Sequence, residues 1–284
     1  MTVVSTLQSR YREVMDRVAR AAERSGRSPR DIFVVAVSKY ADIDDIRELI
    51  ELGHADFGES RAVQLSQRAA IVDEMLTRYR TMREVAAARS ARLADLPVPG
   101  LGANQPALNI PDRVRWHMVG HLQRNKVPKV APSVRLIHSV DSLRLVEELQ
   151  AFGLKKDLDI DVLVQVNCSE EPQKYGCAVA AAQHLCEQID LCANVHIRGL
   201  MTMAAYSENP EDSRTTFRRC AELFEDISKA GYGDGRFNLL SMGMTGDFEV
   251  AIEEGANIVR IGSALFEDPE GRSDHHDDPE PDAD

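Results

Sequence analysis

Lys39 is the residue of this sequence best suited to covalent chemistry, because it follows an apolar run typical of a buried strand. Residues 32–37 are rich in β-branched side chains and come after a break at residues 29–31. In α/β folds, the carboxyl ends of parallel strands carry ligands and catalytic side chains. Burial of a lysine there disfavours the ammonium form, and the neutral amine can form a Schiff base with an aldehyde. The alternative is a structural lysine whose stem packs while its head reaches solvent.

Two turns rich in Gly, Ser and Thr have the composition of an anion site. Residues 241–247 (Ser-Met-Gly-Met-Thr-Gly-Asp) lie between an expected strand and an expected helix, and residues 260–265 (Arg-Ile-Gly-Ser-Ala-Leu) repeat the arrangement. Such turns expose N–H groups and hydroxyls to an anion, and barrels often bind phosphate after their seventh and eighth strands. Small residues also end strands for steric reasons alone. Together with Lys39, the two turns predict a lysine opposite a phosphate site.

Arg260, His117 and His121 are the other polar residues at expected strand ends. Arg260 stands in an apolar run, where it could form a structural ion pair or hydrogen-bond a ring nitrogen or a carboxylate. The two histidines are four residues apart but belong to a strand and the turn after it, whereas zinc-protease spacing requires a helix. We expect hydrogen-bonded residues of the site wall and no metal.

The elements that would position these residues alternate between strand and helix. Helical spacing of apolar residues predicts helices at residues 7–26, 43–53, 142–152, 178–189, 211–230 and 248–255. Strands are expected at residues 32–37, 55–59, 116–120, 136–140, 161–167, 195–201, 237–241 and 257–261. This order predicts one (β/α)8 barrel, with a doubly wound sheet as the alternative. The barrel is favoured because the first and last strands both end in residues suited to one shared site.

Two segments depart from the regular alternation. Residues 67–112 are expected to be an insertion, with a helix at 69–96 and a Pro/Gly loop at 97–102. The simplest expectation is a peripheral feature without chemistry, and the alternative is a cover over the site or a surface for a partner. Residues 267–284 hold nine Asp or Glu and one Arg, a net charge of -8. The rest of the chain therefore carries only -4 of the total charge of -12. They predict a disordered acidic tail after a barrel domain at residues 1–266.

Composition limits the class of protein further. The sequence lacks an apolar stretch long enough to cross a membrane and a secretory signal at its start, which predicts a cytoplasmic protein with no membrane partner. Its five cysteines follow neither disulfide nor zinc spacing, so reduced thiols are expected. The body is not basic, which gives no reason to expect nucleic acid as a partner.

Many short motifs in order resemble the pyridoxal phosphate homeostasis protein family. They span residues of about 30 to 266, excluding the insertion: Val37-Ser38-Lys39, Phe57-Gly58-Glu59, Trp116-His117-Met118-Val119-Gly120-His121-Leu122-Gln123, Ile137-His138-Ser139-Val140-Asp141, Gln165-Val166-Asn167, Lys174-x-Gly176, Arg198-Gly199-Leu200-Met201-Thr202, Ser241-Met242-Gly243-Met244-Thr245 and Val259-Arg260-Ile261-Gly262-Ser263. The resemblance implies an alanine-racemase-type barrel without the racemase's second, β-rich domain.

The resemblance also implies a cofactor and its site. Lys39 would carry pyridoxal 5'-phosphate (PLP) as an internal aldimine, and Arg260 would face the pyridine nitrogen. Ser60 stands where the family usually has Asn. Ser241, Gly243, Gly262 and Ser263 would lie near the phosphate, and Met201 and Met242 would be further cofactor-binding positions.

Three functions follow from these expectations. The first is a PLP-binding protein that holds, buffers or delivers the cofactor, with apo PLP-dependent enzymes as recipients and without robust turnover. The second is an amino-acid racemase or decarboxylase, although two-base racemisation needs a second acid or base that related racemases take from their extra domain. The third is a Schiff-base aldolase whose phosphate site would hold a sugar phosphate.

Overall fold

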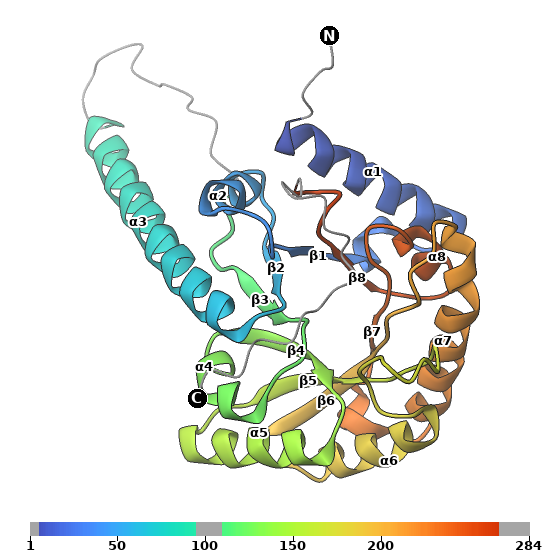
Figure 1. Cartoon of the computed structure of the whole chain (residues 1–284). Helices are drawn as coiled ribbons and strands as arrows, with labels where there is room; N and C mark the ends of the chain where they lie inside the picture. Colours follow the sequence, from blue (N-terminus) through green and yellow to red (C-terminus); the bar gives the residue numbers. More distant parts are fainter. Residues whose placement is uncertain (1–5, 95–109, 267–284) are drawn as a thin grey trace.

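The computed structural model describes residues 6–94 and 110–266, and it contains a closed barrel of eight parallel strands (Figure 1). The strands follow one another around the barrel in sequence order, and the last pairs with the first. The predicted (β/α)8 barrel is therefore confirmed, and the doubly wound alternative is wrong. The strands are β1 Phe33–Val37, β2 Asp56–Glu59, β3 Arg115–Met118, β4 Val134–Val140, β5 Ile160–Gln165, β6 Val195–Met201, β7 Leu239–Ser241 and β8 Ile258–Ile261.

Helices cover the outside of the barrel (Figure 1). The predicted helix at 211–230 begins as a 3-10 turn after Asn209 and continues as an α-helix, while a short helix after residue 126 was not predicted. The α-helices are α1 Leu7–Arg24, α2 Ile43–Glu51, α3 Ala62–Ala94, α4 Val127–Val130, α5 Leu143–Lys156, α6 Val179–Asp190, α7 Arg214–Ser228 and α8 Phe248–Glu253. The 3-10 helices are η1 Pro29–Asp31, η2 Arg124–Lys126, η3 Pro210–Ser213 and η4 Tyr232–Gly235.

The strands are apolar runs because both of their faces are buried. In β1, Val34 and Ala36 pack outward in one large cluster with α1 and α2, whereas Val35 belongs to a separate small cluster inside the barrel. Only the first residue of this strand, Phe33, is exposed. Every second residue after Val35 shares its inward face, so the last of these positions lie at the carboxyl-terminal mouth of the barrel.

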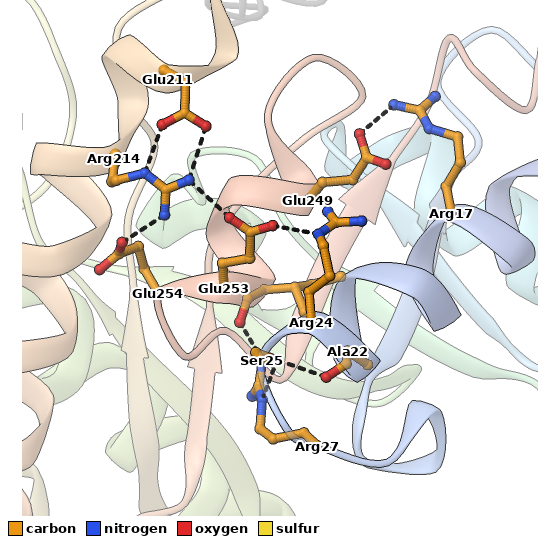
Figure 2. Close-up of polar contacts among 11 residues, drawn as sticks. Arg17, Ala22, Arg24, Ser25, Arg27, Glu211, Arg214, Glu249, Glu253 and Glu254 are labelled. Carbon is orange, nitrogen blue, oxygen red and sulfur yellow. Dashed lines mark hydrogen bonds and ion pairs between the residues drawn. The ribbon is translucent and has the colours of Figure 1, made fainter.

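Ion pairs join the first and last helices across the seam where the barrel closes (Figure 2). Arg17 and Arg24 of α1 bind Glu249 and Glu253 of α8, at 3.0 and 2.8 Å. Arg214 of α7 also binds Glu253, at 2.8 Å. We call this group the outer network; its remaining members are Arg218, Glu211 and Glu254.

Helix α3 is the longest element, and it begins soon after β2. Its first half buries Leu65, Val72 and Leu76 against the barrel, while the side chains of residues 81–88 are exposed. The helix predicted at 69–96 is thus present from Ala62 to Ala94. The predicted loop at 97–102 and the predicted tail at 267–284 lie outside the described residues, and the proposed domain boundaries stay a prediction.

Three further findings concern the described residues alone. Within residues 6–94 and 110–266, no helix combines the length and the apolar character that crossing a membrane requires. The same part of the chain holds no group of three His, Cys, Asp or Glu side chains arranged to bind a metal ion. All five cysteines are free thiols.

Candidate functional site

A small pocket opens at the carboxyl ends of the strands. Four of the predicted site residues line it, namely Lys39 after β1, Ser60 after β2, and Arg260 and Gly262 in and after β8. The rest of its lining is apolar: Val37, Val119, Met203 and Met244. One amine, one guanidinium and a largely apolar wall therefore meet in a single concave site, the general composition of a small-molecule pocket.

Lys39 lies at the rim of the barrel in a half-buried position. Its Nζ atom is 5.1 Å from the centroid of the Tyr40 ring, within the range of a cation–π contact. The sequence predicted a lysine beside apolar strand residues, and Val37 lies next to it in the pocket wall. The position permits access from solvent while the stem packs against the barrel.

Arg68 of α3 holds the loop that carries Lys39. Its guanidinium donates to the carbonyl oxygens of Ser38 and Ala41, on either side of the lysine, and to the carboxylate of Glu59. The Ser38 hydroxyl also donates to Glu59 Oε1, at 2.6 Å. Sequence reasoning missed Arg68 because an arginine in a long amphipathic helix carries no signal, and because residues 67–112 were expected to be peripheral. The first turns of α3 instead position the loop of the candidate site.

Glu59 is the buried partner in this cluster. Its side chain is fully buried, and burial raises its pKa, although Arg68 and the Ser38 hydroxyl act in the opposite direction. Its second oxygen, Oε2, is buried and has no hydrogen-bond partner among the described residues. The arrangement depends on Arg68, because a lone buried carboxylate would be costly.

Arg260 lies on β8, the strand that pairs with β1, where it is in register with Val35, and it is almost fully buried. Its guanidinium donates to Ser241 Oγ at 2.6 Å and to the carbonyl oxygen of Thr202 at 3.0 Å. The Ser241 hydroxyl also contacts His138 Nδ1, at 3.0 Å. Burial, followed by the nearby charges of His117 and Arg260, lowers the pKa of His138 well below its usual range, so this ring is neutral at physiological pH.

The two predicted anion-binding turns lie side by side. The hydroxyl of Thr245 accepts from the backbone N–H of Ala264, at 3.4 Å. Gly243 has a φ of 86°, and a Cβ there would lie 2.6 Å from Ala251 Cβ and 2.8 Å from Phe248 Cα. A glycine is therefore required for the first turn to pack against α8. The sequence pattern predicted such a turn, and the structure adds its contact with the second one.

Comparisons with known proteins place this chain in a family. The family model for the alanine racemase N-terminal domain matches residues 86–269. A pyridoxal phosphate homeostasis protein of Aquifex aeolicus (strain VF5) is 35% identical over 261 residues, covering 90% of this chain and 96% of the relative. This chain belongs to the pyridoxal phosphate homeostasis protein family.

Solved structures extend the likeness to three dimensions. An unknown protein from Bifidobacterium adolescentis is 31% identical, with a TM-score of 0.73 and coverage of 92% of this chain and 94% of that one. PipY of Synechococcus elongatus PCC7942, solved with PLP bound, is 27% identical, with a TM-score of 0.62 and coverage of 88% and 99%. The barrel of this member of the pyridoxal phosphate homeostasis protein family thus has solved counterparts over most of its length.

The other residues predicted as cofactor-binding in this family member lie behind or beside the pocket. Met201 is fully buried and belongs to the interior cluster of Val35, and Met242 is also fully buried. Ser241 is buried against Arg260 and His138, while Gly243 shapes the turn. Ser263 follows Gly262 and is half-buried. Their roles toward a cofactor stay predictions.

The backbone around Ser60 is tightly packed. A Cβ at Gly120 would lie 2.3 Å from the Ser60 carbonyl oxygen, so only glycine allows the segments after β2 and β3 to approach this closely. Of the two histidines expected in the wall, His117 is buried and hydrogen-bonded, whereas His121 stacks on Tyr175 with ring centroids 4.6 Å apart. Neither belongs to the pocket lining.

Proposed function

We propose that this member of the family binds PLP in the pocket between Lys39 and Arg260 and holds it covalently through Lys39. Its role would be PLP homeostasis in the cytoplasm, without robust turnover of a substrate. The observation that carries the proposal is the meeting of one amine and one buried guanidinium in a pocket flanked by two small-residue turns. The PLP-bound structure of PipY supports it.

The residues present fit the chemical groups of PLP. Lys39 supplies the amine that an aldehyde requires, and Arg260 supplies a donor suited to a ring nitrogen. The turns at Gly243 and Gly262 bring backbone and hydroxyl groups to one edge of the pocket, where a phosphate would be accepted. When bound, PLP would supply a reactive aldehyde and an electron-withdrawing ring.

The proposed lack of turnover follows from what surrounds the pocket. Among the described residues that line it, Lys39 is the one side chain able to act as a general acid or base, whereas two-base racemisation needs a second group. A guanidinium does not readily give up its proton, so a ring nitrogen paired with Arg260 would remain a weaker electron sink than one paired with a carboxylic acid. Both features disfavour carbanion chemistry.

The test of this proposal is an absorbance spectrum of the purified protein, before and after borohydride reduction, with the modified peptide identified by mass spectrometry. We expect a visible band that reduction transfers to the peptide containing Lys39. Lys39→Ala should lose the band with an unchanged circular dichroism spectrum, and Lys155→Ala, on the exposed side of α5, should keep it. A band that survived in Lys39→Ala would contradict the site assignment.

Two further measurements separate the alternatives. Incubation of the loaded protein with amino acids should give no racemisation or decarboxylation above the rate of free PLP; substantial turnover would favour the racemase or decarboxylase. Mixing with an apo PLP-dependent enzyme, with free PLP scavenged, tests whether the cofactor passes directly between proteins. A colourless protein that PLP cannot reconstitute would favour the sugar-phosphate aldolase.

A further inference from the structure

A continuous line of polar side chains crosses the apolar interior of the barrel. His117 of β3 lies between Asp56 of β2 and His138 of β4: its Nε2 is 3.2 Å from Asp56 Oδ1, and its Nδ1 is 2.9 Å from His138 Nε2. The other nitrogen of His138 reaches Ser241 of β7, which accepts from Arg260 of β8. Since β4 and β7 are not neighbours in the sheet, the contact between His138 and Ser241 spans the barrel.

The end of this line away from the pocket has a fixed charge. Arg115 donates two hydrogen bonds to Asp56, at 2.6 and 2.5 Å. Burial raises the pKa of Asp56, but the hydrogen bonds from Arg115 and His117 outweigh it and hold this pKa well below its usual range. Asp56 is therefore ionised at physiological pH, and an ionised carboxylate only accepts hydrogen bonds.

That carboxylate fixes the direction of each hydrogen bond that follows. His117 Nε2 faces an acceptor and must carry a proton, so Nδ1 of a singly protonated ring accepts from His138 Nε2–H. His138, as a neutral ring, then accepts at Nδ1 from the Ser241 hydroxyl. The opposite direction would need a second proton on His117, and so another positive charge inside the barrel near the guanidinium of Arg115. The favoured direction needs no additional buried charge.

We propose that Asp56, His117 and His138 are positioning residues for Arg260, acting through a one-way chain of hydrogen bonds from Ser241 to Asp56. We call these five residues the interior chain. The Ser241 hydroxyl donates to His138, which leaves its oxygen to accept from Arg260 and orients the guanidinium at the pocket. The inference rests on the proposed function only where it concerns PLP.

One consequence concerns the phosphate. The proton of the Ser241 hydroxyl is used inside the barrel, so this side chain does not donate to an anion in the pocket. Recognition of a phosphate then falls to the turns at Gly243 and Gly262 and to the hydroxyl of Thr245. This narrows the role that resemblance implied for Ser241, from a phosphate contact to a support of Arg260.

The test is nitrogen-15 NMR of the histidine rings in the protein without cofactor, which reports which ring nitrogen carries a proton. His138 is assigned by the signal that disappears in His138→Gln. We expect the proton on Nε2 in both His117 and His138. Asp56→Asn keeps the shape but removes the charge, so either direction becomes possible and His138 should show both ring forms. The matched control is Asp161→Asn. Asp161 is a strand carboxylate of similar exposure to Asp56, at 11% against 13%, but it accepts from two arginines and lies outside the interior chain.

Titration with PLP supplies the second readout. Asp56→Asn should raise the Kd by about threefold to tenfold, the value of one displaced hydrogen bond, and Asp161→Asn by less than about twofold. Two results would contradict the proposed direction of the hydrogen bonds: a proton on Nδ1 of His138 in the wild type, or unchanged proton positions on the histidine rings of a folded Asp56→Asn variant. If that variant does not fold, the proton positions in the wild type decide the question. An unchanged Kd in Asp56→Asn would overturn the positioning role. A wild type that binds no PLP would instead refute the proposed function and leave the NMR result valid.

Discussion

Asp56 and Glu254 are carboxylates of nearly equal exposure, with 13% and 12% of their side chains accessible, yet their surroundings differ. Glu254, in the outer network, binds Arg214 and Arg218, which are 27% and 58% exposed. Asp56 binds one exposed partner, Arg115, and one buried partner, His117, which is 7% exposed. The exposure of the carboxylate itself therefore does not distinguish these two sites, whereas the exposure of its partners does.

The difference has a physical cause. Water and salt can replace the partners of a carboxylate at the surface, so ion pairs there contribute little to stability. Neither can reach the contact between His117 and His138, and both rings are buried. Loss of one member of the interior chain would leave polar atoms without partners, at a cost that the outer network does not impose.

The largest effect is expected at Arg68, whose partner Glu59 is more deeply buried than any carboxylate of the outer network. Arg68→Met should lower the free energy of unfolding by about 3–5 kcal/mol, because it leaves Glu59 and two carbonyl groups without their donor. Arg17→Met removes a half-exposed pair with Glu249 and should cost less than about 1 kcal/mol. Urea unfolding measures both, and equal losses would erase the distinction between buried and surface pairs.

The second prediction compares the two carboxylates directly. Asp56→Ala should cost about 2–3 kcal/mol, since His117 loses its acceptor inside the barrel. Glu254→Ala should cost about 1 kcal/mol, since Arg214 keeps other partners and Arg218 is free to turn to water. Matched urea unfolding curves provide the measurement. A larger loss for Glu254→Ala would show that the outer network, and not the interior chain, dominates stability.

The third prediction is a pH dependence. The pKa of Asp56 is lower in the folded protein than in the unfolded chain, so the unfolded state takes up a proton first on acidification. The contribution of Asp56 is complete above about pH 4 and is lost as the pH falls below that value, by about 1–2 kcal/mol between pH 6 and pH 3. Asp56→Asn should remove this part of the pH dependence, as measured by urea unfolding at both values. Glu254→Gln should change it less, and the reverse order would contradict the comparison.

The barrel could be predicted from the sequence because its strands are buried on both faces and therefore appear as apolar runs. The run at residues 195–201 coincides with β6, and the others differ from the observed strands by a few residues at their ends. The positions of Lys39 and Arg260 were predictable for the same reason, since carboxyl-terminal strand ends meet in one place.

The contacts that support the site could not be predicted in this way. His138 and Ser241 are 103 positions apart and meet across the barrel, so no local pattern of residues indicates that they touch. Arg68 lies in an exposed-looking helix, and only the packing of α3 against β2 brings it to the loop of Lys39. Sequence patterns show where strands end, whereas side-chain pairs inside the barrel depend on its closure.

The smallest expected effect concerns salt, and it tests the comparison without disturbing the interior. Arg214→Gln should cost about 1 kcal/mol at 0.1 M NaCl and about half of that at 1 M, because the screening length falls from about 10 Å to about 3 Å. The cost of Asp56→Asn should change less over the same range, since its contact with His117 is shielded from ions. Urea is the suitable denaturant because guanidinium chloride is itself a salt. If both costs fell in parallel, ions would be reaching the contact between Asp56 and His117. The interior chain would then be no more isolated from solvent than the ion pairs of the outer network.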